Sequence, residues 1–161
     1  MLYADARPLI KSGDLLAFSH RGWGSWRDIK IQIVRFFTQS EYSHVGTAWV
    51  IGDRVFVIEA VIPKVRIYPL SKLLPFYHLP LNAPWYPRTL ELALSKVGEP
   101  YSQVQAIKAF FSVPTPDTYW QCAELALAIA ASDDIGLGYK ATPTAVVNAA
   151  LVHGSTLTLV T

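Results

Sequence analysis

The first half of the chain has the residue pattern of β-strands. SGDLLAFS at residues 12–19 predicts a turn that leads into an apolar strand. HVGTAWVI and RVFVIEA are rich in β-branched and aromatic residues, and Gly52-Asp53 between them is a two-residue hairpin signal. Further strands are expected at 65–70, at 76–81 and, at the end of the chain, in STLTLV.

The second half of the chain has the residue pattern of α-helices. Apolar residues at helical spacing predict helices at 88–98, ended by Gly98, and at 103–111. TYWQCAELALAIAAS predicts a third, and TPTAVVNAALVHG a fourth, with Thr142 as N-cap and Pro143 at the first helical position. One helix, 26–38 with Ser25 as N-cap, is expected in the first half. Strands that precede helices, rather than alternating with them, predict an α+β fold.

Length and composition narrow the class of protein. A chain of 161 residues is expected to form a single domain, residues 1–161, with a substantial core. A composition that is 52% hydrophobic and 16% charged excludes a disordered protein. The net charge is +2 and the basic residues are scattered, so no nucleic-acid partner is expected.

The chain shows no targeting or membrane segment. Its first residues, MLYADARPLIKSGD, lack the basic start and apolar core of a secretory signal. LALAIAA at 125–131 is too short to span a bilayer. The default location is therefore cytoplasmic, and the alternatives are association with a virion or delivery to the periplasm by another machine.

The single cysteine, Cys122, admits two interpretations. Thr118 and Gln121 fit a T-x-x-Q capping box with Tyr119 as the first helical residue, which puts Cys122 near the end of the first turn. There the helix dipole favours a thiolate, and the free N–H groups can stabilise an oxyanion. However, free cysteines are among the most buried residues, and position alone favours an inert core residue.

A histidine and a glutamate on the predicted hairpin favour the reactive interpretation. If Gly52-Asp53 is the turn, Gly46 lies opposite Glu59, and His44 is a diagonal neighbour of Glu59 on the same face. A carboxylate could then orient the imidazole towards a thiol. The alternatives for Glu59 are an ion pair with Arg54 or Arg66, or a position at an edge open to water.

Other polar residues are weaker candidates. His20 lies in a glycine-rich loop, His78 flanks Pro80 and suggests an edge strand, and His153 closes the last helix. Asp14 is interpreted as a turn residue. No histidine pair has metal-ligand spacing, so no metal or other cofactor is expected. Candidates for binding an oxyanion or substrate are Tyr101, Tyr119 and Gln121.

The order of these motifs resembles a known family. SGDLLAF, YSHVGTAWV, VFVIEAV, VGEPYS and WQCAEL follow one another as in the circularly permuted papain-like proteins, the YiiX/YaeF type of the NlpC superfamily. The resemblance covers roughly residues 12–150 and depends on the order and spacing of short motifs. It implies an antiparallel sheet packed against a central helix that carries the cysteine.

The resemblance also implies a chemistry. Cys122 would be the nucleophile, His44 the base and Glu59 the orienting residue of a cysteine amidase or peptidase, with cell-wall peptides as first substrate candidates. Two departures from the family are Ala123, where many relatives have serine, and the lack of a secretory leader. The alternatives are a lipid acyltransferase or thioesterase of the lecithin:retinol acyltransferase type, and a non-catalytic component of a phage or secretion assembly.

Overall fold

The computed structural model describes residues 1–19, 41–101, 120–138 and 140–161. Within this part of the chain, six strands form one sheet in the order β4-β3-β2-β1-β5-β6, and neighbouring strands are antiparallel. The strands are β1 (Leu15–Phe18), β2 (His44–Ile51), β3 (Arg54–Val61), β4 (Lys64–Pro69), β5 (Phe76–Leu79) and β6 (Thr158–Val160). The helices are α1 (Tyr3–Ala6), α3 (Pro87–Ser95), α5 (Cys122–Ser132) and α6 (Pro143–Val152), with the 3₁₀ turns η1 (Arg7–Leu9) and η2 (Leu70–Lys72).

The predicted strands and the α+β class are confirmed. Gly52-Asp53 forms the turn of the β2–β3 hairpin, in which Ile51 pairs with Arg54, and Gly52 has the positive φ of 59° that such a turn favours. In α6, Thr142 caps the helix by accepting a hydrogen bond from the backbone N–H of Ala145, and Pro143 occupies the first turn, as predicted. The predicted helices 26–38 and 103–111 lie outside the described residues.

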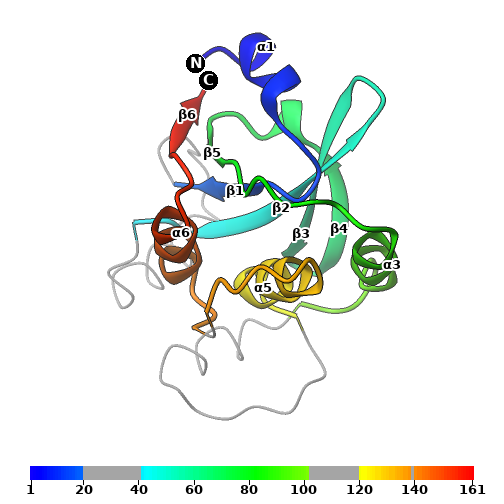
Figure 1. The fold of residues 1–161 in the computed structure, drawn as a ribbon. Coiled ribbons are helices and arrows are strands. Elements are labelled where there is room, and N and C mark those ends of the chain that lie inside the picture. The colour runs from blue at the N-terminus through cyan, green and yellow to red at the C-terminus, as the bar shows by residue number, and fades with distance from the viewer. Residues whose placement is uncertain (20–40, 102–119, 139) are drawn as a thin grey trace, which may run out of the picture.

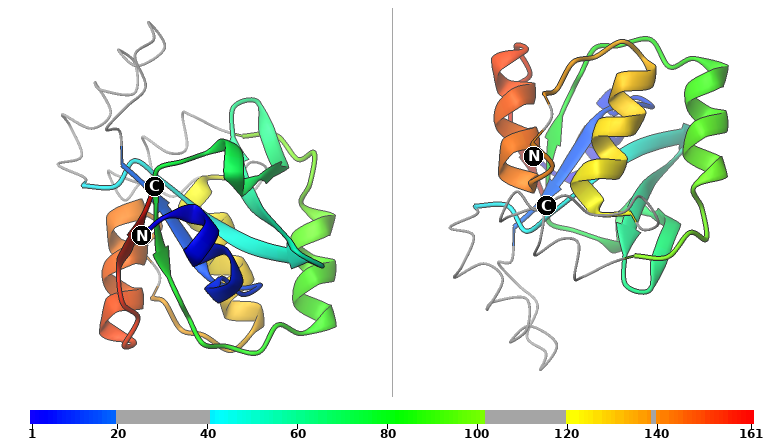
Figure 2. Two further views of the ribbon diagram at one scale, coloured as in Figure 1. Left: turned by 90° about the horizontal axis from the view of Figure 1, so that it is seen from above. Right: turned by 90° about the horizontal axis from the view of Figure 1, so that it is seen from below.

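Helices cover the two faces of the sheet unequally (Figure 1). Seen from below, α6, α5 and α3 lie side by side over one face, whereas the short α1 lies over the other (Figure 2). Strand alternation sorts the core accordingly: Leu15 and Val45 pack with Cys122 and the rest of α5, while Leu16 and Phe76 pack on the opposite side. The cysteine helix is therefore central, as expected.

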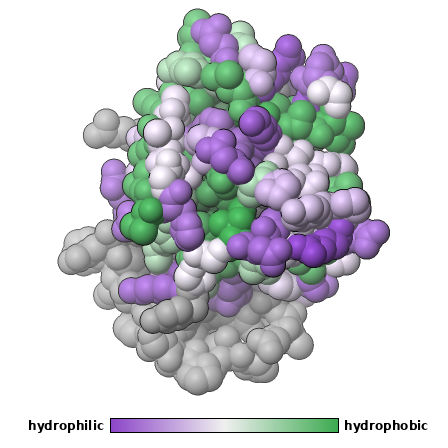
Figure 3. Space-filling model, viewed as in Figure 1, coloured by the Kyte–Doolittle hydropathy of each residue, from purple (hydrophilic) through white to green (hydrophobic). Residues whose placement is uncertain are grey.

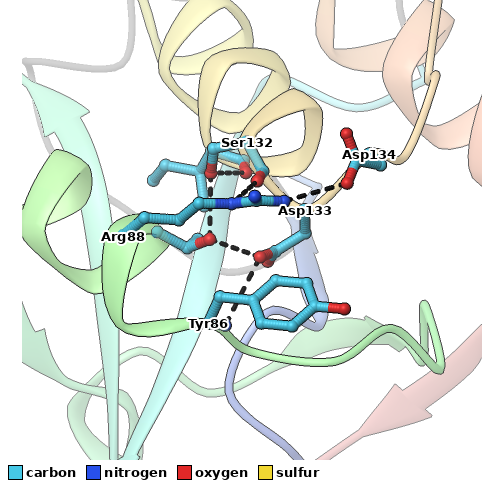
Figure 4. Close-up of polar contacts among 7 residues, drawn as sticks. Tyr86, Arg88, Ser132, Asp133 and Asp134 are labelled. Atoms are coloured by element: carbon cyan, nitrogen blue, oxygen red, sulfur yellow. Dashed lines mark hydrogen bonds and ion pairs between the residues drawn. The ribbon is translucent and has the colours of Figure 1, made fainter.

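The carboxyl end of α5 is joined to α3 by a polar cluster (Figure 4). The hydroxyl of Thr89 donates to the buried carboxylate of Asp133. Arg88 donates at 2.9 Å to the carbonyl of Ser132 and at 2.9 Å to the carboxylate of Asp134. These contacts fix the carboxyl end of α5 against the start of α3.

The described residues contain no helix that is both long enough and apolar enough to cross a membrane. Figure 3 shows polar and apolar residues intermixed over the face seen in Figure 1.

Gly46 allows β2 and β3 to approach closely beside Glu59. A Cβ at this position would lie 2.5 Å from Cγ2 of Val57 and 3.3 Å from Cβ of Glu59. Because valine is stiff at χ1, the clash cannot be relieved by a simple rotation. We expect Gly46→Ala to lower the free energy of unfolding by about 1–3 kcal/mol in urea titrations. Gly136→Ala is the matched control, since nothing lies within 4 Å of its Cβ position. Equal losses of unfolding free energy in both variants would contradict a close approach of β2 and β3 that requires glycine at position 46.

Candidate active site

Cys122 is the first residue of α5, which corrects the helix start predicted from the sequence. Trp120 forms a bridge with Tyr101, and Gln121 is extended, with φ −104° and ψ 158°. The helix therefore begins at Cys122 and not at Tyr119, and the capping box is formed by Gln121 and Glu124. Tyr119 itself lies outside the described residues. The corrected start brings the thiol closer to the positive end of the helix dipole than the sequence suggested.

Gln121 is buried, and its side chain caps the cysteine helix. It accepts a hydrogen bond from the backbone N–H of Glu124, and its Nε2 donates to Oε1 of Glu124 at 3.2 Å. The backbone N–H of Gln121 donates in turn to Oε2 of Glu124 at 3.1 Å. These contacts lock the geometry of the first turn, on which the position of Cys122 depends.

The predicted contact between His44 and Glu59 is present. Nε2 of His44 lies 2.7 Å from Oε2 of Glu59, and Gly46 leaves space for the pair. The ring of Phe18, the cross-strand neighbour of His44, lies beside the imidazole with 5.4 Å between ring centroids. Because Nε2 is bonded to the carboxylate, Nδ1 is the nitrogen left to meet the thiol of Cys122.

Glu59 has a second partner. Its Oε1 accepts a hydrogen bond from Nε of Arg66 at 2.8 Å and lies 2.7 Å from Nη2 of the same guanidinium in an ion pair. The sequence interpretation favoured His44 over Arg66 as the partner of Glu59. The contact with His44 is present, but the two residues are not alternatives, because each contacts a different oxygen of one carboxylate. Arg54 lies at the opposite end of β3, paired with Ile51. Only 2% of the Glu59 side chain is exposed, and both cations favour its ionised form against the cost of burial.

The thiol and the imidazole favour the charged pair. Burial alone would raise the pKa of Cys122, but hydrogen bonding to His44, its positive charge, and the backbone N–H groups of Val45 and Ala123 hold that pKa below the ordinary 9.0. Burial would likewise lower the pKa of His44, but hydrogen bonds with Cys122 and Glu59 raise it to about 10. For Glu59, burial would raise the pKa, but His44 and Arg66 lower it overall. The arrangement therefore favours thiolate, imidazolium and carboxylate together.

Tyr101 lies at the same site. Burial and the negative charges of Cys122 and Glu124 raise the pKa of its hydroxyl, so the group stays protonated and can donate a hydrogen bond. Its place is fixed by the bridge to Trp120, two residues before the cysteine. Trp120 is itself held by donation from its indole N–H to Glu99.

The other histidines do not join this site where the structure describes them. His78 is not on an edge, as its sequence suggested, because β5 lies between β1 and β6. Its Nε2 lies 2.7 Å from Oδ2 of Asp14, which also accepts from the backbone N–H of Lys11, so Asp14 anchors a buried contact with His78 as well as a turn. His153 ends α6 and contacts the carbonyl of Gly136 at 2.7 Å, which agrees with a structural role. His20 lies outside the described residues.

Arg66 is the residue that sequence reasoning undervalued. The signal was a second two-residue turn, Ile62-Pro63, which sets β3 against β4 so that Val61 pairs with Lys64 and Glu59 with Arg66. The sequence interpretation began β4 one residue late, at 65, and did not extend the pairing across this turn. The register count used for β2 and β3 would have placed Arg66 directly opposite Glu59.

Comparisons with known proteins give a match in structure. Neither a protein-family model nor a curated protein sequence matches the chain. Among solved structures, the chain is similar to the metalloprotein YiiX from Escherichia coli O157:H7, with a TM-score of 0.56 and 20% sequence identity over 80% of this chain and 69% of that one. The similarity shows that the chain shares the fold of YiiX, as the motif order predicted.

Proposed function

We propose that this protein is a cysteine hydrolase that cleaves an amide bond through a thioester intermediate. One arrangement carries the proposal: Cys122 is the first residue of a helix, its thiol is electrostatically coupled to His44, and Nε2 of His44 is bound by Glu59. Cys122 is the nucleophile, His44 the acid and base, and Glu59 the residue that orients the imidazole. Similarity in fold to YiiX is consistent with this chemistry.

The reaction follows from the charges of the resting site. The Cys122 thiolate attacks the amide carbonyl, a C–S bond forms, and the carbonyl electron pair moves to oxygen. The backbone N–H of Cys122, at the start of α5, and the hydroxyl of Tyr101 stabilise this oxyanion. The His44 imidazolium then gives its Nδ1 proton to the amide nitrogen, the C–N bond breaks, and the amine leaves.

The second half of the reaction regenerates the site. His44, now neutral, takes a proton from water at Nδ1, and the hydroxide attacks the thioester carbonyl. The C–S bond breaks, and the carboxylic acid product leaves behind the thiolate and imidazolium of the resting state. Glu59 stays ionised throughout and keeps Nε2 protonated.

The first substrates to test are peptides, and peptidoglycan stem peptides are the leading class. We would incubate the protein with cell-wall fragments and, separately, with phospholipid vesicles, and analyse intact protein by mass spectrometry. We expect an acyl adduct on wild-type protein from the peptides, and none on Cys122→Ala. An adduct from lipid and none from peptide would contradict the amidase proposal and indicate an acyltransferase or thioesterase.

YiiX is described as a metalloprotein, which raises the question whether these residues could hold a metal ion. The described residues contain no group of three or more His, Cys, Asp or Glu side chains that could hold a metal ion. At the Cys122 site, both oxygens of Glu59 are bound by cationic side chains, which is the wrong environment for a further cation. These residues do not fit a metal centre, and no step of the proposed reaction uses one.

A further inference from the structure

We propose that Arg66 is a positioning residue for the Cys122 site: it binds Oε1 of Glu59 and so fixes the carboxylate with Oε2 directed at His44. This inference rests on the proposed function. Two nitrogens of Arg66 lie 2.8 and 2.7 Å from the same oxygen. A planar guanidinium can make both contacts at once, whereas a lysine ammonium is a single point charge.

The position of Arg66 is itself constrained. Arg66 and Glu59 are directly paired across β3 and β4, so the backbone brings the two side chains together. The guanidinium lies over the ring of Tyr68, 4.4 Å from its centroid. Tyr68 is two residues further along β4 and therefore on the same face of the sheet. The result is a continuous chain of contacts from Tyr68 through Arg66, Glu59 and His44 to Cys122.

Glu59 and Arg66 differ in their exposure to solvent. Glu59 is buried, whereas 40% of the Arg66 side chain is exposed. Loss of Arg66 would leave a buried carboxylate with one partner, and that carboxylate would take up a proton more readily. A protonated Glu59 no longer supports the imidazolium that keeps Cys122 ionised. Of the charged groups in the described part of the chain, His44 from β2 and Arg66 from β4 face Glu59, and Cys122 from α5 faces His44.

The test follows thiolate formation, which needs no substrate. The pH dependence of Cys122 alkylation by iodoacetamide would be measured in wild type, Arg66→Gln, Glu59→Gln and the double variant. We expect Arg66→Gln to move the midpoint to higher pH by about one unit, a rate loss of about tenfold on the acidic side. In the Glu59→Gln background the same substitution should have no further effect, because the carboxylate on which Arg66 acts is gone.

Two further variants keep the outcome clear. Arg54→Gln removes an arginine from the far end of β3 and should leave the midpoint unchanged. Arg66→Lys keeps the charge and the strand, and should give a smaller shift than Arg66→Gln. An unchanged midpoint in Arg66→Gln, or an equal shift in the Glu59→Gln background, would overturn the inference. Absence of a low-pH thiolate in wild type would instead contradict the proposed function, so the two failures are distinguishable.

Discussion

Replacing His44 with alanine should slow alkylation of Cys122 at neutral pH by about 30-fold or more. The imidazolium is the main group that lowers the pKa of this buried thiol, against the effect of burial. Without it, the thiolate fraction falls to the few per cent or less expected of an unassisted cysteine. Amide hydrolysis should fall further, by about 100- to 10,000-fold, because the acid and base of both half-reactions is also lost.

The His44→Ala variant is expected to fold, since Glu59 keeps its ion pair with Arg66. Folding would be checked by circular dichroism before the rates are compared. His153→Ala is the matched control, because that histidine ends α6 and its ring contacts a backbone carbonyl. Equal alkylation rates in His44→Ala and wild type would show that the imidazole does not activate the thiol.

The pH dependence of hydrolysis should be bell-shaped and displaced from that of free cysteine. Activity requires the thiolate, which forms above the lowered pKa of Cys122, and the imidazolium, which persists until the pKa of His44 at about 10. The rate should therefore rise at a pH below 9.0, the ordinary pKa of cysteine, and fall near 10. A rise at or above 9.0 would contradict the charged pair.

The free energy of unfolding should depend on pH through the same charged groups. The raised pKa of His44 gives a contribution that is complete below its ordinary 6.5 and is lost as pH rises through about 10. The lowered pKa of Glu59 gives a contribution that is complete above its ordinary 4.5 and is lost as pH falls through the folded value. Both contributions are complete between pH 4.5 and 6.5. In urea titrations below pH 4.5, the free energy of unfolding should therefore fall less steeply with decreasing pH in Glu59→Gln than in wild type.

The hairpin was predictable because its register depends on local features. A two-residue turn at Gly52-Asp53 fixes the pairing, and strand alternation then places His44 and Glu59 on one face. The same count across Ile62-Pro63 leads to Arg66. These residues are close in sequence, so few assumptions separate the pattern from the contact.

The features that the sequence did not predict correctly depend on contacts between distant segments of the chain. The start of α5 was misplaced because T-x-x-Q and Q-x-x-E are both acceptable caps, and the bridge from Trp120 to Tyr101 selects the second. The environment of His78 was misread because β6, from the end of the chain, pairs beyond β5 and makes it an inner strand. Neither contact leaves a local trace in the sequence.

The most direct measurement compares one thiol in two states. Cys122 is the single cysteine of the chain, so iodoacetamide reports on it alone, in native protein and in protein unfolded by urea at neutral pH. Cys122 is only 8% exposed, and a core cysteine of that burial should react more slowly when folded. We expect the reverse, faster alkylation in the native state, because the helix terminus and His44 hold the sulfur as a thiolate. Slower alkylation in the native state would contradict a nucleophilic Cys122.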